Sequence, residues 1–596
     1  MQVKNTYQLY DFILKNKILL LIIVVFSFFI LKNLDNSYLW KDEAGTANVA
    51  YNTMIKGYPT VYDGKNLLST SDGNNFNSKL LVSNHEWLQY YICAGSFALL
   101  GKTTFAARLP FALFAIASIF IIWLIAKKIF DSSNQSNVAC FLYAINVQFL
   151  LYARQARYYS LVLFFTAAST LVMFELVDIL KGKKRIISYK KYGTMFLFTF
   201  FVSFLFLSNR LGGIVFAAAV AGYVVINHNK RLLIIIFLLG AGIIPWGLWY
   251  FINNISFNAP GFGGNGIETH VFTKIIMILW KIQVYFLPII SLIVITIVFY
   301  LLNFILGKKE KIIYTGKKIF FIFLVISNII FTAVPKWGIV NHYYLSVLVA
   351  TPFILLPILE FIWKSSKICS FILVVMLVFT NVINILPYGI LYSVPSENNE
   401  VNNLLSDNYS WTTNYGLFSS PDTDADFRIT PLSVYKSKIH VECYLYDYLK
   451  ELKNGYYSPI QEICDHINKY SKKSDTILFV GMEYEPIIFY TNLRVVNNLS
   501  TKLRPWSEYF SVYPNQEKYG DLTHVDDDKI NWIILKKDSS PALFLDNENY
   551  LKDNRSLFNI YTSETSDIIL STSADIDYHK FDTVVNGSKF TIWHRK

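Results

Sequence analysis

Long runs of apolar residues recur through the first two thirds of this chain and constrain its fold more than any other feature. Examples are Ile18 to Leu31, Phe111 to Ala126 and Ile368 to Val382. A helix of about 17 to 25 apolar residues spans a bilayer, and helices suit lipid because they satisfy their own backbone hydrogen bonds. Only 16% of the 596 residues are charged, well below the roughly one quarter typical of soluble domains. The chain is therefore predicted to be a polytopic α-helical membrane protein.

Clusters of Lys and Arg in the short loops between these runs set the expected topology. The positive-inside rule places such clusters in the cytoplasm. The net charge of +12 then reflects loop composition rather than contact with nucleic acid. The first apolar run is not followed by a small-residue cleavage site and is interpreted as a retained anchor. The clusters are Lys15/Lys17, Lys127/Lys128, Lys181 to Arg185 with Lys190/Lys191, Lys230/Arg231, Lys308 to Lys318, and Lys364/Lys367.

Placing every cluster inside predicts about eleven transmembrane helices, within a range of about 11 to 13. The N-terminus is then cytoplasmic and the C-terminal tail extracytoplasmic. The predicted spans are 18–33, 109–129, 137–153, 158–180, 193–208, 211–227, 232–253, 284–306, 319–335, 342–362 and 368–388.

The segment from Trp87 to Leu100 is apolar but only about 14 residues long, which is short for a span. If it crossed the bilayer, every later basic loop would move outside. It is therefore predicted to be an interfacial helix on the outer surface. The loop 34–108 is then extracytoplasmic and is part of a transmembrane domain of residues 1–390. Long loops of this kind commonly carry function.

Residues 391–596 are polar, with short apolar runs, and are predicted to form a soluble extracytoplasmic α/β domain. Thr476 to Gly481 and Trp532 to Leu535 are typical of buried strands, and Glu483 to Tyr490 of a helix start. Cys443 and Cys464 lie in this domain. Either a disulfide or two free thiols fits the sequence.

Asp42 and Glu43 follow the first span on the outer side and form the first candidate for chemistry. A carboxylate can act as a general base on a hydroxyl. Neighbouring residues on a helix point about 100° apart, so only one of the two can face a given atom, and Asp42 is favoured. The alternative is that both acids stabilise a helix N-terminus through its dipole.

His85 and Glu86 precede the predicted interfacial helix and form the second candidate. Side chains of these types at a membrane surface bind a metal ion or position a phosphate. The alternative is a polar helix start with Asn84 as its N-cap.

Arg154 and Arg157 lie at the outer end of a predicted span, where the positive-inside rule disfavours cations. A guanidinium binds phosphate through two parallel hydrogen bonds. The pair, with Tyr158 and Tyr159 beside it, therefore predicts a site for a lipid phosphate. Snorkelling or pairing with a loop acid is the alternative. Arg210, at the outer end of another predicted helix, is a further candidate of the same kind.

Lys336 is a further outer cation, and His342 and Tyr343 follow it. The alternative for this segment is an aromatic belt at the interface. Two other motifs are not taken as sites. Gly261 to Gly266 looks like a phosphate loop but follows no strand, and Cys464-x-His466 lacks a partner pair with metal-ligand spacing.

The order of these motifs resembles a known family. The Asp-Glu pair and the His-containing segment are followed by Arg108-Leu109-Pro110, Lys127-Lys128-Ile129-Phe130 and Arg154-x-Ala156-Arg157-x-Tyr159. This series resembles the dolichyl- or polyprenyl-phosphate-mannose protein mannosyltransferase-like family of the GT-C superfamily, which also includes the lipid A aminoarabinose transferases. The likeness covers residues 10 to 390 and is strongest from Lys41 to Leu161.

The resemblance implies an inverting glycosyltransferase that moves a hexosyl or pentosyl group from a polyprenyl-phosphate donor on the extracytoplasmic face. The acceptor would be a lipid, a glycan or a protein. The family's acids map onto Asp42 and Glu43, with Asp42 as the base, and its arginine motif onto Arg154 and Arg157. Relatives often have His-Pro-Pro-Leu where this chain has His85-Glu86-Trp87-Leu88, an acid in place of Gln155, and an Arg near His342.

The expected protein is thus a GT-C type enzyme of the cell membrane with the polyprenyl-phosphate donor and membrane lipids as partners and no nucleic acid. A divalent metal ion is left open, and no other cofactor is expected. A transporter or flippase for a lipid-linked saccharide is the alternative. It should place ionisable residues at mid-membrane within repeated halves, and no repeat is visible in the sequence. The expected site residues are Asp42 and Glu43 for catalysis, Arg154, Arg157, Tyr158, Arg210 and Lys336 for the donor phosphate, and His85, Glu86, Tyr159, His342 and Tyr343 for other substrate contacts.

Overall fold

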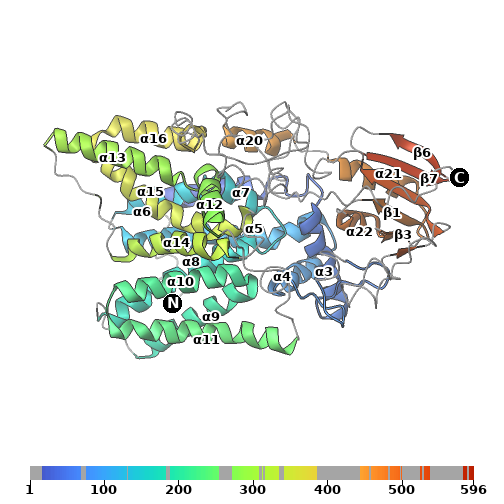
Figure 1. Cartoon of the computed structure of the whole chain (residues 1–596), viewed down its shortest axis with the longest axis horizontal. Helices are drawn as coiled ribbons and strands as arrows, with labels where there is room; N and C mark the ends of the chain where they lie inside the picture. The colour runs from blue at the N-terminus through green and yellow to red at the C-terminus, as the bar shows by residue number, and fades with distance from the viewer. Residues whose placement is uncertain are drawn as a thin grey trace, which may run out of the picture.

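A computed structural model shows an elongated molecule with a helical bundle at one end and a β-sheet at the other (Figure 1). The structure describes residues 16–68, 75–130, 132–182, 188–253, 271–307, 312, 316–334, 341–384, 443–454, 458–480, 484–496, 498–499, 524–525, 529–536, 581–586 and 590–596.

The first part of the chain is helical throughout its described residues, apart from connecting loops. Among the described residues, six helices are long and apolar enough to cross a membrane, or seven if one bent pair of helices is taken as a single span. The helices are α2 (Lys17–Leu31), α3 (Lys41–Lys56), α4 (Leu88–Leu100), α5 (Thr104–Ile129), α6 (Ser133–Ala144), α7 (Val147–Ala153), α8 (Tyr159–Leu180), α9 (Ser188–Ser208), α10 (Arg210–Ile226), α11 (Leu233–Ile252), α12 (Val271–Tyr285), α13 (Ile289–Ile305), α14 (Ile319–Ala333), α15 (Leu345–Ser365) and α16 (Lys367–Phe379).

Each of the eleven predicted spans coincides with helix, but three differ in detail. The span predicted at 137–153 consists of α6 and α7, which meet at an angle of 63°. The Asn146 side chain accepts hydrogen bonds from the N–H groups of Gln148 and Phe149 and so starts a new helix. The span predicted at 284–306 begins only at Ile289, because a separate helix, α12, precedes it. The sequence analysis did not predict α12, since lysines interrupt its apolar run. The span predicted at 368–388 ends as a helix at Phe379.

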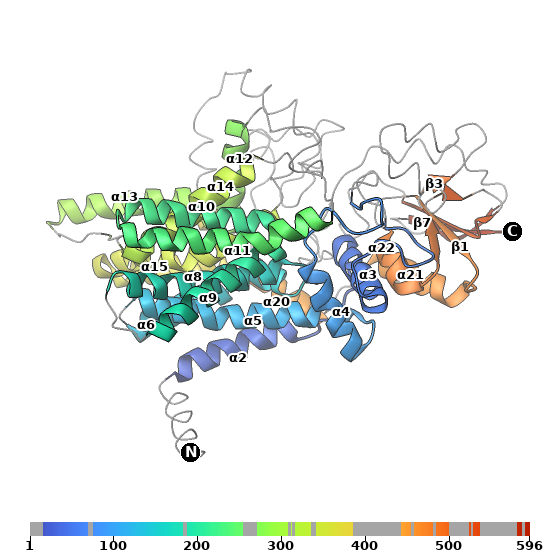
Figure 2. The same cartoon turned by 90° about the horizontal axis from the view of Figure 1, so that it is seen from below.

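The basic loops converge on one end of the bundle. Lys128 pairs with Glu175 of α8. Lys317 pairs with Asp178 at 2.6 Å, and Lys181 donates to Asn227 at 2.6 Å. The other end carries α3, α4 and the sheet (Figure 2). Because α5 has 26 residues, at 1.5 Å per residue it separates the two ends by about 39 Å. The described basic loops therefore share one end, as the topology requires.

The described residues of the C-terminal part form three further helices and a mixed β-sheet. The predicted strands are confirmed as β1 and β5, which pair in parallel with Ile477 opposite Trp532, and the predicted helix start is confirmed as α22. The sheet order is β2-β1-β5-β7-β6, with β5, β7 and β6 antiparallel. The elements are α20 (Tyr444–Asn454), α21 (Pro459–Tyr470), β1 (Thr476–Val480), α22 (Glu485–Thr491), β2 (Arg494–Val496), β3 (Asn498–Leu499), β4 (His524–Val525), β5 (Trp532–Lys536), β6 (Phe581–Asn586) and β7 (Phe590–Arg595).

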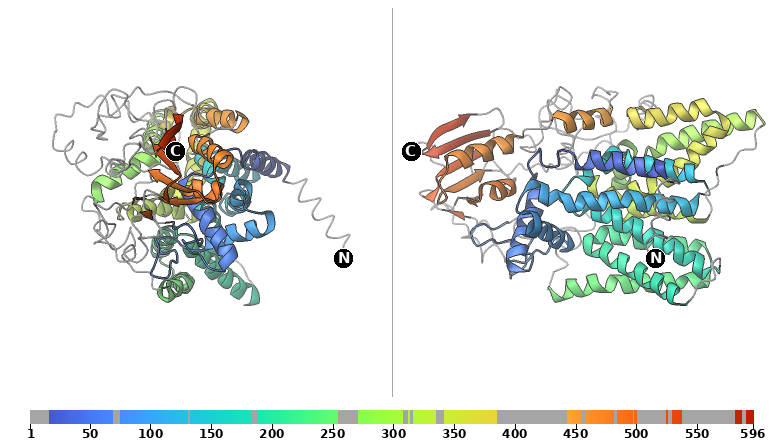
Figure 3. Two further views of the ribbon diagram at one scale, coloured as in Figure 1. Left: turned by 90° about the vertical axis from the view of Figure 1, so that its right-hand side faces the viewer. Right: turned by 180° about the vertical axis from the view of Figure 1, so that it is seen from behind.

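Residues of the long loop 34–108 share one hydrophobic core with this sheet. Val61, Leu67 and Phe76 of the loop pack in the same buried cluster as Ile477 of β1 and Ile487 of α22. The Asn66 side chain donates to the Leu493 carbonyl at 2.9 Å and accepts from the Val495 N–H at 2.8 Å. Figure 3 shows the loop helices α3 and α4 between the bundle and the sheet. The loop and the C-terminal part thus fold as a continuous unit.

All five cysteines carry free thiols, so the disulfide between Cys443 and Cys464 that the sequence left open is not formed. Cys464 is buried in the core of the C-terminal part.

Candidate functional site

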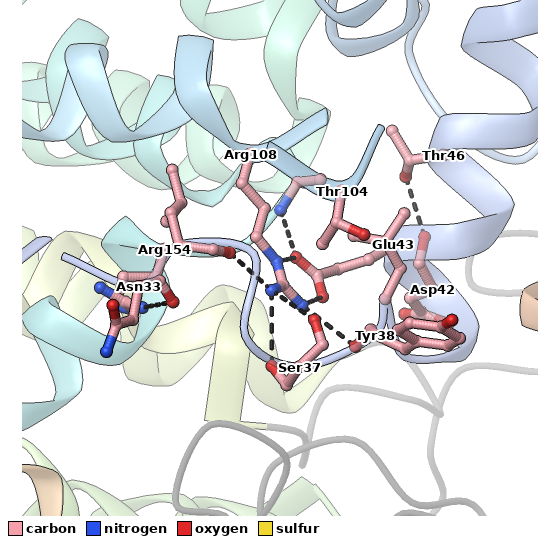
Figure 4. A network of polar contacts seen from close by, with 12 residues as sticks. Asn33, Ser37, Tyr38, Asp42, Glu43, Thr46, Thr104, Arg108 and Arg154 are labelled. Carbon is pink, nitrogen blue, oxygen red and sulfur yellow. Dashed lines mark hydrogen bonds and ion pairs between the residues drawn. The ribbon is translucent and has the colours of Figure 1, made fainter. Parts of the chain in front are cut away.

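Glu43 forms a buried ion pair at the start of α3. Its carboxylate accepts from Arg108 Nε at 2.8 Å and from Arg108 Nη2 at 2.6 Å, and a third hydrogen bond comes from the Ala156 N–H at 2.7 Å. The remaining donors of Arg108 bond to the carbonyls of Leu34, Ser37 and Tyr38 (Figure 4). This network joins the start of α3 to α5 and to the turn before α8. The Glu43 carboxylate is fully engaged in it.

Asp42 occupies a more open position on the same helical turn. Its side chain is 31% exposed, against 1% for Glu43. Arg157 Nη2 lies 3.0 Å from Asp42 Oδ2, and Arg157 Nη1 donates to Thr46 Oγ1 at 3.2 Å. The other carboxylate oxygen of Asp42 makes no hydrogen bond to the described residues. Of the two adjacent acids, Asp42 is therefore the more accessible one.

Arg157 is buried, and its Nε finds no hydrogen-bond partner within the described part of the chain. Its guanidinium carbon lies 5.3 Å from the centre of the Tyr158 ring and 5.9 Å from that of Tyr159. A buried donor without a partner costs about 1–3 kcal/mol. Within the described residues, Asp42 is thus the carboxylate that pairs with Arg157, and the Nε donor of Arg157 remains unused.

Arg154 is placed differently, although only three residues separate it from Arg157. Its Nη1 donates to the carbonyls of Phe29, Ile30 and Lys32 at 3.0, 2.7 and 2.7 Å, and its Nη2 to that of Asn33 at 2.8 Å. The carbonyls of Phe29 and Ile30 belong to the last turn of α2, whose carbonyls lack partners within the helix, and those of Lys32 and Asn33 follow it directly. Arg154 lies on the far side of the Glu43–Arg108 pair from Asp42 (Figure 4). The structure thus does not bring the two predicted arginines together.

A group of aromatic rings borders Arg157. The His342 ring stacks on Tyr159 with 5.2 Å between centroids and lies 4.4 Å from that of Tyr343. The Nδ1 atom of His342 is buried and has no hydrogen-bond partner in the described residues. The beginning of α8 and the short helix that precedes α15 therefore bring together the predicted residues Tyr158, Tyr159, His342 and Tyr343.

His85, Glu86 and Arg210 form the adjoining part of the site. Arg210 Nε lies 3.7 Å from Glu86 Oε1, and Arg210 Nη2 donates to the Asn84 carbonyl at 3.2 Å. The His85 ring lies 6.1 Å from that of Tyr158. The N-cap role considered for Asn84 is not observed, because α4 begins at Leu88 with Trp87 as its N-cap.

Burial shifts the pKa values of Glu86 and His85 in opposite directions. It raises the pKa of Glu86, although the positive charge of Arg210 opposes the shift. It lowers the pKa of His85 well below its usual value, and the positive charges of Arg157 and Arg210 add to that effect. His85 is therefore a neutral imidazole at pH 7, able to donate one hydrogen bond and accept another.

Other motifs fall away from this site or outside the described residues. Lys336 and the glycine-rich segment 261–266 lie outside them. His466 packs on Trp532, with ring centres 6.0 Å apart, in the core of the C-terminal part. The described residues contain no group of three or more His, Cys, Asp or Glu side chains that could hold a metal ion.

The structure adds three residues to the predicted set: Arg108, Thr46 and Gln89. The Gln89 Oε1 accepts from the Tyr158 N–H at 3.3 Å. Two sequence signals could have found the others. Arg108 is a third arginine at the outer end of a span, and Thr46 stands four residues after Asp42, which places it on the same helical face.

Comparison with known proteins gives a family match over part of the chain and a similar fold over nearly all of it. Residues 84–249 match the family model described as dolichyl-phosphate-mannose-protein mannosyltransferase. No curated protein matches this chain. The matched segment contains His85, Arg108, Arg157 and Arg210, and it begins after Asp42. The family resemblance expected from the sequence is confirmed over these residues.

Solved structures share the fold over nearly the whole chain. The crystal structure of ArnT from Cupriavidus metallidurans bound to undecaprenyl phosphate is similar with a TM-score of 0.54 and 11% sequence identity, covering 96% of this chain and 97% of that one. The apo state of the same protein gives a TM-score of 0.53 with 11% identity and 96% coverage of both chains. The expected fold, a helical membrane bundle with a C-terminal domain, is thereby confirmed as similar to that of ArnT.

Proposed function

We propose that this protein is an inverting glycosyltransferase that transfers a sugar from a polyprenyl-phosphate donor to an acceptor hydroxyl on the extracytoplasmic side of the membrane. The observation that carries the proposal is the pair Asp42–Arg157. It combines a partly exposed carboxylate with a buried guanidinium that has a donor to spare. The undecaprenyl phosphate bound to the structurally similar ArnT supports a polyprenyl phosphate as the lipid part of the donor.

In the proposed reaction, Asp42 accepts the proton of the acceptor hydroxyl. The oxygen of that hydroxyl forms a bond to the anomeric carbon of the sugar from the face opposite the phosphate. The bond between the anomeric carbon and the phosphate oxygen breaks, and its electron pair leaves with the polyprenyl phosphate. The transition state has oxocarbenium character, and negative charge grows on the departing phosphate. Fixed cations and hydrogen-bond donors stabilise that charge.

Arg157 is the proposed phosphate ligand. Its unpartnered Nε is available at once, and its Nη2 becomes available when the phosphate replaces Asp42 as the partner. A guanidinium that faces phosphate through two donors binds it in the bidentate manner. Loss of the Arg157 contact also raises the basicity of Asp42. Donor binding would therefore prepare the base for the proton transfer.

The other predicted residues take supporting roles in this proposal. The imidazoles of His85 and His342, which lie beside Tyr158 and Tyr159, donate hydrogen bonds to the donor. Arg210 and Glu86 border the same region and contact the sugar or the acceptor. Lys336 remains a proposed further phosphate ligand.

Glu43 and Arg154 hold the framework instead of touching the substrate. Glu43 fixes the first turn of α3 through Arg108. Arg154 binds the carboxyl end of α2.

The membrane orientation belongs to the same proposal. All described basic loops meet at the end of the bundle opposite to Asp42 and Arg157. If the positive-inside rule holds, the site opens on the extracytoplasmic side. Labelling of single cysteines introduced at Lys127 and Lys311 tests this orientation, because labelling from outside at either position would contradict it.

The transfer reaction is tested with the full-length protein in liposomes. A radiolabelled polyprenyl-phosphate sugar is supplied with lipid extract from the source membrane as acceptor. The proposal predicts that polyprenyl phosphate is released only when both substrates are present, and that the labelled sugar appears in a new product. Movement of intact donor across the bilayer without release of polyprenyl phosphate would instead identify a flippase. Mass spectrometry of surface glycans from cells with and without the protein then identifies the acceptor.

A further inference from the structure

Tyr490 of the C-terminal part reaches into the segment that leads to the acidic pair. Its ring stacks on that of Tyr38 with 3.7 Å between centroids and an angle of 14°. Its hydroxyl accepts from the Leu39 N–H at 2.8 Å and lies 2.7 Å from Thr104 Oγ1. Leu39 stands just before α3, and Thr104 opens α5. One tyrosine thus joins the starts of the two helices that carry Asp42 and Arg108.

The segment bound by Tyr490 also bonds to the buried ion pair. The carbonyls of Ser37 and Tyr38 accept from Arg108 at 2.9 and 3.2 Å. Arg108 in turn holds Glu43, the neighbour of Asp42. A continuous chain of contacts therefore runs from the C-terminal part to the first turn of α3.

Two more contacts join α3 to α22 of the C-terminal part. Asn48 of α3 donates to the Glu485 carbonyl of α22 at 2.9 Å. The Lys102 ammonium lies between the rings of Tyr51 of α3 and Phe489 of α22, 4.7 Å from the centre of each. Cation–π pairs of this kind contribute to stability when partly desolvated. The helix with the acids is thus fixed along its length by α22.

We infer that the C-terminal part completes the active site, with Tyr490 as a positioning residue for Asp42. The inference rests on the proposed function, because it takes Asp42 as the base. A general base must lie within about 2.6–3.2 Å of the proton it accepts. A displacement of about 1 Å at a distant support can lower the rate about a hundredfold. Tyr490 therefore acts through Asp42 on the catalytic step. Its hydrogen bonds within the described residues go to Leu39, Thr104 and Asn468 and not to Arg157, the proposed donor ligand.

The test compares Tyr490→Phe with Tyr470→Phe in the full-length protein. The first substitution keeps the stacking on Tyr38 but removes the hydroxyl that binds Leu39 and Thr104. Tyr470 is 56% exposed in the same part of the chain, and its hydroxyl makes no hydrogen bond to the described residues, so its substitution is the matched control. Tyr490→Phe should lower kcat roughly ten- to hundredfold with the donor KM unchanged. Thr104→Ala should lower it in the same manner, and Thr104→Ser should restore it.

Hydrogen exchange of residues 38–46 gives a measurement that needs no turnover. Exchange should be faster in Tyr490→Phe than in the wild-type protein and unchanged in Tyr470→Phe. Faster exchange without a fall in kcat, or unaltered exchange and kcat, would overturn the positioning role. If the wild-type protein transfers no sugar while exchange responds as expected, the proposed function has failed and the structural coupling stands.

Discussion

Replacing Glu43 by Gln tests how the two adjacent acids divide their work. Glu43 accepts two hydrogen bonds from Arg108 and one from the Ala156 N–H, and its side chain is 1% exposed. The amide cannot accept all three and leaves the buried charge of Arg108 without its counter-charge. Removing one partner of a buried ion pair costs about 3–5 kcal/mol. The Glu43→Gln variant should therefore lose stability by that amount.

The assay is thermal unfolding of the purified protein in detergent, combined with turnover per folded molecule. Glu462→Gln is the matched control, because Glu462 lies exposed in the first turn of α21 and its substitution should change stability by less than about 0.5 kcal/mol. The folded fraction of Glu43→Gln keeps Asp42 as the base, so its turnover per folded molecule should fall less than that of Asp42→Asn. An unfolding temperature equal to that of the wild type would refute the structural assignment of Glu43. A stable but inactive variant would move the catalytic role to Glu43.

Three further predictions follow from the contacts described above. Arg157→Ala should raise the donor KM strongly, and Arg157→Lys should lower it again only in part, because an ammonium keeps the charge but loses the two parallel donors of the guanidinium. A donor KM equal to that of the wild type in both variants would remove Arg157 from the site. Burial lowers the pKa of Lys102 to about 8 from its ordinary 10.5, so between these pH values the unfolded chain binds more protons than the folded one. The free energy of unfolding should therefore rise with pH across that window. A Lys102→Gln variant with the same pH slope would contradict this. Asn66→Ala removes the bonds to Leu493 and Val495, which should cost about 1–3 kcal/mol in thermal unfolding, and a variant as stable as wild type would show that the loop and the sheet do not depend on each other.

The sequence predicted the helices well because membrane spans are a local property. Apolar runs and basic loops recur over short distances, and each predicted span coincides with helix. The bend between α6 and α7 depends on the side chain of one residue, Asn146, within an apolar run. The lysines at 274 and 281 interrupt the apolar pattern of α12, so the run-based prediction missed that helix.

The sequence predicted the residues of the candidate site, but it did not predict which arginine pairs with Asp42. Asp42 and Arg157 were both expected on the outer side, and nothing in the sequence distinguishes Arg157 from Arg154 as the partner. The two arginines diverge because α7 ends at Ala153 and α8 begins at Tyr159, so the turn between them is not helical. One guanidinium then meets the end of α2 and the other meets α3.

The sequence also did not predict the long-range packing, because contacts between distant segments leave no local pattern. Tyr490 and Leu39 are 451 residues apart in the chain, and no local pattern connects them. The apolar loop residues such as Val61 and Phe76 give no sign that their partners lie in β1 and α22. The shared core of the loop and the C-terminal part is therefore known only from the structure.

The central claim is that Asp42 is the base of a transfer reaction, and Asp42→Asn tests it most directly. The amide has the same size and still accepts a hydrogen bond from Arg157, but it cannot take a proton. Donor binding and single-turnover transfer are measured on the same preparation. The account predicts a donor Kd no higher than that of the wild type, an unfolding temperature close to that of the wild type, and a rate lower by about 10² to 10⁴. Near-normal transfer by this folded variant would contradict it.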